Sequence, residues 1–168
     1  MIRTVLLLAA VAGAVLFLVW WFSPDQVVER RSRSLFRVLT IDAGTGIPAR
    51  LAGMGSLDAM LADEVFIDHV ALPEVEGTIG CAQIKDVLGW LCRHARRTRF
   101  DVAGIDSIEV DGAIARVDLV LEVLVELPDR RLMKGMHPVT LGWRLAGKSW
   151  VLERVEGRGL PVDRIAND

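Results

Sequence analysis

An uninterrupted apolar run near the amino terminus constrains this chain more than any other feature. Val5 to Phe22 are 18 consecutive residues without a charge, a proline, an asparagine or a glutamine. As an α-helix rising about 1.5 Å per residue, the run spans roughly 27 Å, close to the hydrocarbon thickness of a bilayer. Trp20, Trp21 and Phe22 end the run, and aromatic residues are typical of the lipid–water boundary. The pattern predicts a transmembrane anchor over residues 1–23 of a single-pass membrane protein.

A cleaved signal peptide is the main alternative for the same segment. Arg3 could form its basic start, and Ala10-Val11-Ala12 and Ala12-Gly13-Ala14 are small-residue triplets. Eight further apolar residues follow Ala14, however, and the run is longer than the usual hydrophobic region of about 7–15 residues. The length therefore favours an uncleaved anchor, with a buried core helix as a third interpretation.

Four arginines follow the apolar run closely, at positions 30, 31, 33 and 37. An excess of basic residues beside a span favours the cytoplasmic side for the soluble domain, although short-tailed anchors often leave that domain outside. Basic residues so close to a bilayer also attract anionic headgroups. We therefore expect Arg30, Arg31, Arg33 and Arg37 to contact the membrane, with a merely solvated helix face as the alternative.

The charge balance and the cysteines exclude other classes. Arg3 is the only charged residue before Asp25, so the remaining chain has three more acidic than basic side chains, which argues against a nucleic-acid partner. Cys81 and Cys92 fall on one predicted helix, roughly 16 Å apart, whereas a disulfide needs Cα atoms within about 7 Å. The three histidines lack close-spaced partners, so we expect no metal and no cofactor.

Hydrophobic periodicity predicts the elements of the domain that follows, residues 24–156. Helices are expected at 24–42, 56–63 and 79–96, and strands at 65–70, 99–110, 113–127, 137–145 and 149–156. Asp111-Gly112 is a strong hairpin signal because a type I′ turn needs positive φ. Residues 157–168 form a polar tail. Helices that precede an antiparallel meander indicate an α+β domain, with three helices on one side of a curved sheet.

Four segments in this order resemble the NTF2-like superfamily, whose members are also described as SnoaL-like or cystatin-like α+β cones. Residues 61–68 are similar to its passage from the second helix into the first strand, and Gly77 with the following helix to its third-helix entry. Residues 108–117 and 143–152 are similar to its central and closing hairpins. The resemblance implies a cone with a mainly antiparallel sheet and a pocket at its open end.

The resemblance also implies a set of possible functions. The superfamily contains isomerases, dehydratases and epoxide hydrolases, and it contains domains without chemistry. Several bacterial members sit behind a single membrane helix as assembly parts, and the wide sheet is a frequent dimer surface. We therefore expect a membrane-tethered, non-catalytic binding module that contacts itself, another protein or a small apolar ligand. The alternative is a lyase, isomerase or hydrolase.

Ketosteroid isomerases within the superfamily offer a test for chemistry. When the sequences are aligned by the acidic pair Asp63-Glu64, their general-base aspartate falls on His69 and their oxyanion acid near Thr140. Their oxyanion tyrosine has no counterpart, because this chain contains no tyrosine. The isomerase mechanism is therefore disfavoured. For an enzyme, His69 is the candidate base, with Asp68 or His137 as helper, and the expected pocket contains His69, Thr140 and Trp143. A hydrogen-bonded structural histidine is the competing interpretation.

Overall fold

The computed structural model describes residues 2–42, 44–69, 77–127 and 132–157. For residues 2–10 and for His69 it describes the backbone without the side chain. Residues 158–168 of the predicted polar tail lie outside the described residues.

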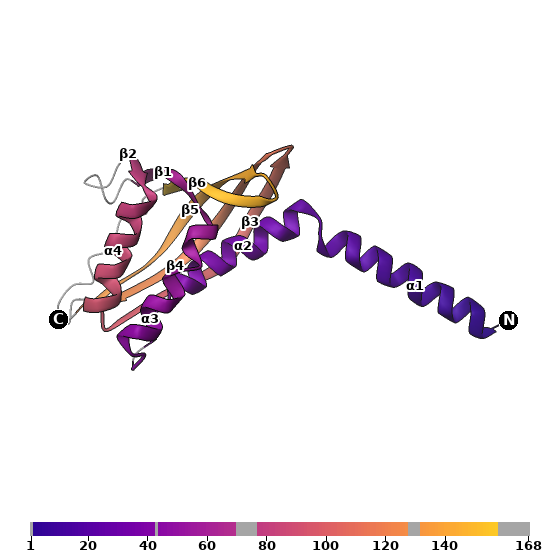
Figure 1. Cartoon of the computed structure of the whole chain (residues 1–168), viewed down its shortest axis with the longest axis horizontal. Helices are drawn as coiled ribbons and strands as arrows, with labels where there is room; N and C mark the ends of the chain where they lie inside the picture. Colours follow the sequence, from indigo (N-terminus) through magenta and orange to yellow (C-terminus); the bar gives the residue numbers. More distant parts are fainter. Residues whose placement is uncertain (1, 43, 70–76, 128–131, 158–168) are drawn as a thin grey trace.

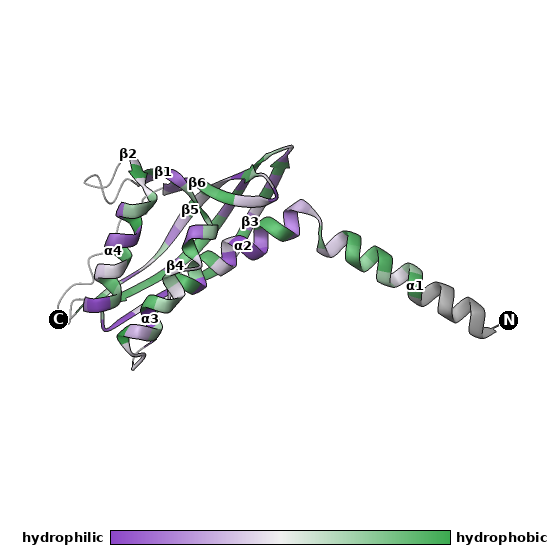
Figure 2. Ribbon diagram, in the orientation of Figure 1, coloured by the Kyte–Doolittle hydropathy of each residue, from purple (hydrophilic) through white to green (hydrophobic). Residues whose placement is uncertain are grey.

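Two consecutive helices begin the chain. Helix α1 (Ile2–Trp21) is followed by α2 (Pro24–Leu39), which begins at the predicted proline, where a missing N–H costs nothing. Within the described residues no single helix satisfies the length and hydropathy expected of a membrane span, but Val11–Trp21 and Pro24–Leu39 satisfy them together, as a pair bent by 57°. Figure 2 shows hydrophobic residues along the described part of α1, which projects away from the rest of the molecule.

The domain contains a six-stranded mixed sheet (Figure 1). Its strands are β1 (Leu61–His69), β2 (Gly77–Gly80), β3 (Arg97–Asp111), β4 (Ile114–Glu126), β5 (Leu132–Ala146) and β6 (Ser149–Gly157). They lie in the order β2-β1-β6-β5-β4-β3, and β1 and β6 are the parallel pair. The four predicted strands of the meander are confirmed, and the mainly antiparallel character of the sheet with them.

The structure corrects the prediction between α2 and the third helix. The short helix expected at 56–63 is replaced by α3 (Ile47–Met54) and a 3₁₀ turn at Leu57–Ala59. Leu61 is already part of β1, since it lies beside Leu152 of β6. Strand β2 replaces the predicted start of the third helix, because Gly77–Gly80 pairs with β1, and α4 therefore begins at Cys81 and ends at His94.

One face of the sheet, here called the inner face, packs against the helices. Alternate residues of β4, namely Ala115, Val117, Leu119 and Leu121, are buried on it, as period-2 patterning requires. Val28, Leu35 and Phe36 of α2 and Trp143 of β5 belong to the same core. The expected arrangement of helices on one side of a sheet is therefore confirmed, and the opposite, outer face remains uncovered by described helices.

Polar side chains connect the helices to this sheet and to one another. Thr98 of β3 donates a hydrogen bond to the Leu39 carbonyl at 2.7 Å and accepts one from the Ile41 amide at 3.0 Å. Arg50 of α3 donates to the Ala95 carbonyl at 2.8 Å, at the end of α4. These bonds satisfy carbonyls that a helix end leaves without a partner.

Candidate functional site

The strand register brings the backbones of the two candidate catalytic histidines to the same end of the sheet. His69 lies beside Gly157 of β6, and Gly157 lies beside Val139 of β5. Strands are about 4.8 Å apart, so His69 and His137, two residues from Val139, are separated by roughly 12 Å at the backbone. The His137 side chain is half-buried, and Asp68 is exposed. The side chain of His69 lies outside the described residues.

Thr140 and Trp143 do not line a common pocket. They are three positions apart on β5, so their side chains point to opposite faces. Trp143 is only 1% exposed within the core, and its indole N–H has no hydrogen-bond partner among the described residues. Thr140 is on the outer face and donates a hydrogen bond to Asp118 of β4. The odd spacing of the two residues was visible in the sequence.

Asp118 is the centre of a polar network on the outer face. Ser107 donates to its Oδ2 atom at 3.0 Å, Thr140 to its Oδ1 atom, and Arg116 pairs with it at 3.4 Å. Partial burial acts to raise the pKa of Asp118, but the hydrogen bonds from Thr140, Ser107 and Arg116 outweigh it, so the pKa lies below its usual value. The network thus holds a carboxylate ionised on the sheet surface.

We expect the substitution Thr140→Val to raise the pKa of Asp118, because it removes a donor that stabilises the ionised form. NMR titration of the Asp118 carboxyl carbon measures the change, with Ser34→Ala as a control outside the network. In the native chain a lowered folded-state pKa means that this group stabilises the fold above the unfolded pKa of about 3.9 and that the contribution is lost as pH falls through the folded value. An unchanged pKa in the variant would contradict the assigned bond.

The outer face has an apolar centre on β4 and β5. Val120 lies beside Pro138, and Met136, which is 45% exposed, lies beside Glu122. Leu124, which lies beside Lys134, continues this row along β4, and Val120, Leu124, Met136 and Pro138 are here called the apolar strip. Ion pairs surround this strip on the same face: Arg99–Asp101, Lys134–Glu122, Arg116–Asp118 and Arg144–Glu153. The strip therefore combines exposed apolar area with neighbouring charges that form ion pairs.

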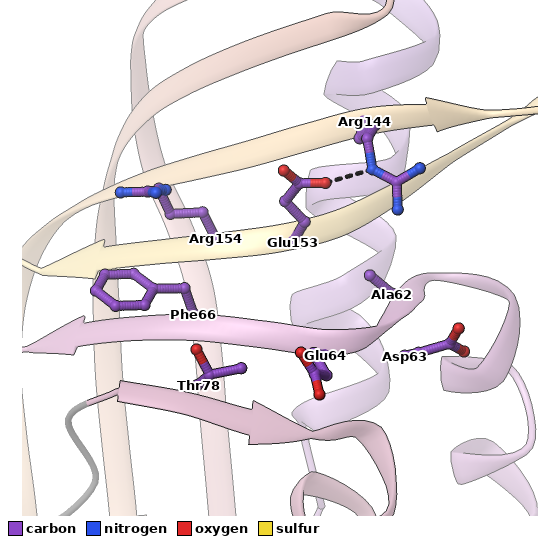
Figure 3. Close-up of a pocket in the computed structure, with 8 residues that line it drawn as sticks. All are labelled: Ala62, Asp63, Glu64, Phe66, Thr78, Arg144, Glu153 and Arg154. Carbon is purple, nitrogen blue, oxygen red and sulfur yellow. Dashed lines mark hydrogen bonds and ion pairs between the residues drawn. The ribbon is translucent and has the colours of Figure 1, made fainter.

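A hollow of about 560 Å³ opens on the outer face where β2, β1, β6 and β5 lie side by side (Figure 3). It forms where both central strands are irregular: the β1–β6 register shifts between Leu61 and Phe66, and the β5–β6 register shifts at Gly142. The second irregularity directs two consecutive side chains, Glu153 and Arg154, to one face, as a β-bulge does. The lining residues are Ala62, Asp63, Glu64, Phe66, Thr78, Arg144, Glu153 and Arg154.

Gly142 makes room for this arrangement. A Cβ atom at position 142 would lie 2.9 Å from the Cβ of Arg154, closer than real side chains approach. Arg154 can therefore lie flat over the sheet, with its guanidinium carbon 4.8 Å from the centre of the Phe66 ring. The glycine and the bulge together shape one wall of the hollow.

The arginines after α1 do not act as one group. Arg30 donates to the Trp21 carbonyl at 2.7 Å and stacks 4.3 Å above the Trp21 ring. Arg31 points toward the domain and donates to the Ala59 carbonyl at 2.7 Å, and partial burial lowers its pKa. Arg33 pairs with Glu29 at 3.0 Å, and Arg37 is exposed. The spacing of 30, 33 and 37 gives one helix face, from which Arg31 is excluded.

The hollow is not predicted by the sequence pattern. Glu64, Phe66 and Asp68 share a strand face by simple alternation, which the sequence does show. The two register shifts have no short sequence signal apart from Gly142, and glycine within a strand is only a weak indication of a bulge. Among the described residues, no group of three or more histidine, cysteine or acidic side chains is arranged to hold a metal ion.

Comparison with solved structures shows the fold. The chain is similar to an NTF2-like superfamily protein from Salmonella enterica (TM-score 0.61, 11% identity, 86% of this chain and 96% of the other). It is also similar to an uncharacterised protein with a cystatin-like fold from Caulobacter vibrioides (TM-score 0.60, 12% identity, 82% of this chain and 89% of the other). A third similar structure is a candidate dehydratase of the NTF2-like family from Streptomyces avermitilis, with a TM-score of 0.59 and 15% identity over 82% of this chain and 99% of the other. No family model and no curated protein matches this sequence. The predicted NTF2-like, cystatin-like fold is confirmed at the level of architecture.

Proposed function

We propose that this chain is a membrane-tethered, non-catalytic module of the NTF2-like fold that self-associates through the outer face of its sheet. The observation that carries the proposal is that two apolar surfaces are exposed while the core of the domain is filled by packed side chains. One is α1, and the other is the strip on β4 and β5. The inner face, where this fold would enclose a ligand, is occupied by packed side chains of α2, β4 and β5 in the described residues.

The tether is supported by the exposure of α1. The side chains of Val15, Leu16 and Phe17 are each more than half exposed, although a core helix would bury them. An all-round apolar helix that its own domain leaves uncovered is expected to be covered by lipid. The third interpretation from the sequence, a buried core helix, therefore does not fit the described part of α1.

The bend after α1 supports a contact between α2 and the headgroups. For an α1 perpendicular to the bilayer, a helix leaving at 57° rises only about 0.8 Å per residue. Arg30 and Arg33 would then lie roughly 5 and 7 Å above the start of α2, within the Debye length of about 8 Å. We assign the membrane-facing role to Arg30 and Arg33, with Arg37 on the same helix face but beyond one Debye length, and favour the cytoplasmic side for the domain. Protease accessibility in sealed vesicles of known orientation decides the side.

Self-association is supported by the composition of the outer face. An interface commonly has an apolar centre with a polar rim, and the strip of Val120, Leu124 and Met136 lies within a ring of ion pairs. Because those pairs form within one chain, two copies can bring their apolar strips together while the charges beside the strips stay paired. A tether also confines copies to the membrane plane, which raises their effective concentration.

We expect Met136→Glu to raise the dissociation constant of the dimer at least tenfold, because it places an unpaired charge at the centre of the interface. Detergent-solubilised chain is measured by light scattering across a concentration series. Met133→Glu is the matched control, since Met133 is similarly exposed but lies on the other side of β5. A native chain that remains monomeric at the highest concentration contradicts the proposed interface and leaves the tether intact.

One observation favours the enzyme alternative, a small-molecule lyase, isomerase or hydrolase with His69 as base. The register places the backbones of His69 and His137 at one end of the sheet. A pair of histidines can supply a general base and a helper. Ligand-detected NMR with apolar small molecules tests this candidate. Saturable binding that is lost in His69→Leu supports it, and failure of every compound to bind near His69 opposes it.

A further inference from the structure

We propose that an open edge along the first half of β5 binds residues 158–164 of the same chain, as an extended segment that continues β6. These residues lie outside the described part of the chain, so the inference rests on the edge that would receive them and on their sequence. It concerns the domain alone and does not depend on the tether or on self-association.

Strand β5 extends beyond its neighbour β6. Its residues 132–138 pair with β4 on one side, but the last described pair with β6 is Val139 beside Gly157, so no described strand pairs with their other side. Burial follows this boundary, since Val139 is 7% exposed whereas Met133 and Met136 are 57% and 45% exposed. The first half of β5 is therefore a sheet edge with exposed apolar side chains on both faces, and native proteins usually cover such an edge.

The backbone of this edge directs hydrogen-bonding groups outward at alternate positions. Leu145 donates its N–H group to the Ala113 carbonyl, on the β4 side. Because N–H directions alternate along a strand and β5 pairs with β4 without interruption, even-numbered residues of β5 direct their N–H groups away from β4. Pro138 falls in this phase, where its missing N–H removes no bond to β4. Lys134 and Met136 therefore present N–H and C=O groups to the open side.

The chain leaves β6 at the start of this edge. Gly157 lies beside Val139, so a continued register would place residue 158 opposite Pro138 and residue 164 opposite Leu132. Eleven residues follow Gly157, and the first seven are enough to cover the edge. A segment attached at the end of the edge has a higher effective concentration there than a peptide from solution. The same chain is therefore the favoured occupant.

The sequence of the segment fits the continued register. Leu160 would lie beside Met136 on the outer face, where the two side chains form an apolar cross-strand pair. Pro161 would lie opposite Gly135, in the phase whose N–H group faces away from β5, which is the phase that tolerates a proline. A shift of one residue would turn Leu160 to the inner face and put the proline where a donor is needed.

The inner face of the edge also matches. The His137 ring leans over Gly135, since a Cβ atom added at position 135 would lie 2.8 Å from the His137 Nε2 atom. The residue opposite His137 in the continued register is Gly159, which has no side chain to compete with that ring for space. The edge and the segment are therefore complementary on both faces.

Amide hydrogen exchange of the full chain in detergent micelles, measured by NMR, tests the proposal. We expect the amides of Lys134 and Met136 to exchange at least tenfold more slowly in the native chain than in Leu160→Pro, which removes a donor that faces β5. Asp163→Pro is the matched control, because the N–H group of residue 163 faces away from β5, and it should preserve the protection. Circular dichroism verifies that each variant keeps the fold.

A second measurement identifies the occupant. In a sample that mixes two differently labelled copies, a nuclear Overhauser contact between the methyl groups of Leu160 and Met136 is expected within one chain. A contact that appears only between copies assigns the edge to a second copy and overturns the proposal. Fast exchange of Lys134 and Met136 in the native chain, or equal exchange in the native chain and Leu160→Pro, overturns it as well.

Discussion

Truncation of the buried tryptophan, Trp143→Ala, should lower the free energy of unfolding of the domain by about 3–5 kcal/mol. Trp143 is 1% exposed and lies on the inner face beside Ala115 of β4 and Leu152 of β6. Its removal leaves a cavity between two strands and α2, and partial relaxation cannot restore the lost contacts. Chemical denaturation of the full chain in a mild detergent, followed by circular dichroism of the sheet, measures the change.

Trp90→Ala is the matched control for this experiment. Trp90 has the same side chain on α4 but is 47% exposed, so its truncation should cost less than about 1 kcal/mol. Trp143→Phe adds information, because it keeps an aromatic ring and removes the buried indole N–H that lacks a partner among the described residues. We expect it to cost clearly less than Trp143→Ala. Equal stabilities for Trp143→Ala and Trp90→Ala would show that β5 does not present residue 143 to the core.

The second large effect concerns the membrane. Replacing Gly13 and Leu16 by arginine should release the chain from membranes, because each arginine at the centre of a span costs roughly 2.5–3.5 kcal/mol. Two such costs correspond to a change in partition of more than about 1,000-fold. The measurement is the fraction of chain that membranes retain after extraction with alkaline carbonate. We expect near-complete retention of the native chain and near-complete loss of the double variant.

A control with the same added charge separates insertion from surface binding. Ile114→Arg with Val87→Arg places two arginines at exposed positions of the domain, and this variant should be retained. Intact mass of the membrane-bound chain tests the signal-peptide alternative at the same time. A chain shortened after Ala14, or a native chain that carbonate extracts, is incompatible with the proposed anchor.

Local patterns were sufficient for the meander but not for the region before it. The strands from β3 to β6 show period-2 alternation, and Gly112, which has a positive φ, lies in the turn between β3 and β4, although Asp111 itself is the last residue of β3. Both signals act between neighbouring residues. Strand β1 depends instead on its parallel pairing with β6, about 90 residues later in the chain. That pairing extends the strand back to Leu61 and displaces the expected helix to α3. The short strand β2 likewise exists only because β1 offers it an edge.

The candidate sites, too, were predicted from the sequence only in part. The face of Arg30, Arg33 and Arg37 follows from helical spacing, yet only the structure shows that Arg31 points to the Ala59 carbonyl. Alternation on β5 already separates Thr140 from Trp143. The hollow could not be read from the sequence, because a register shift results from competition among three neighbouring strands.

The sequence by itself determined the apolar helix, the order of the meander and which residues of β4 enter the core. Those properties depend on hydrophobic periodicity, which is written within a few residues. The tertiary structure alone decided the parallel placement of β1, the bulge at Glu153 and the juxtaposition of Asp63 and Glu64 with the paired arginines. These features arise from hydrogen bonds between strands distant in the chain, and no local pattern records their register.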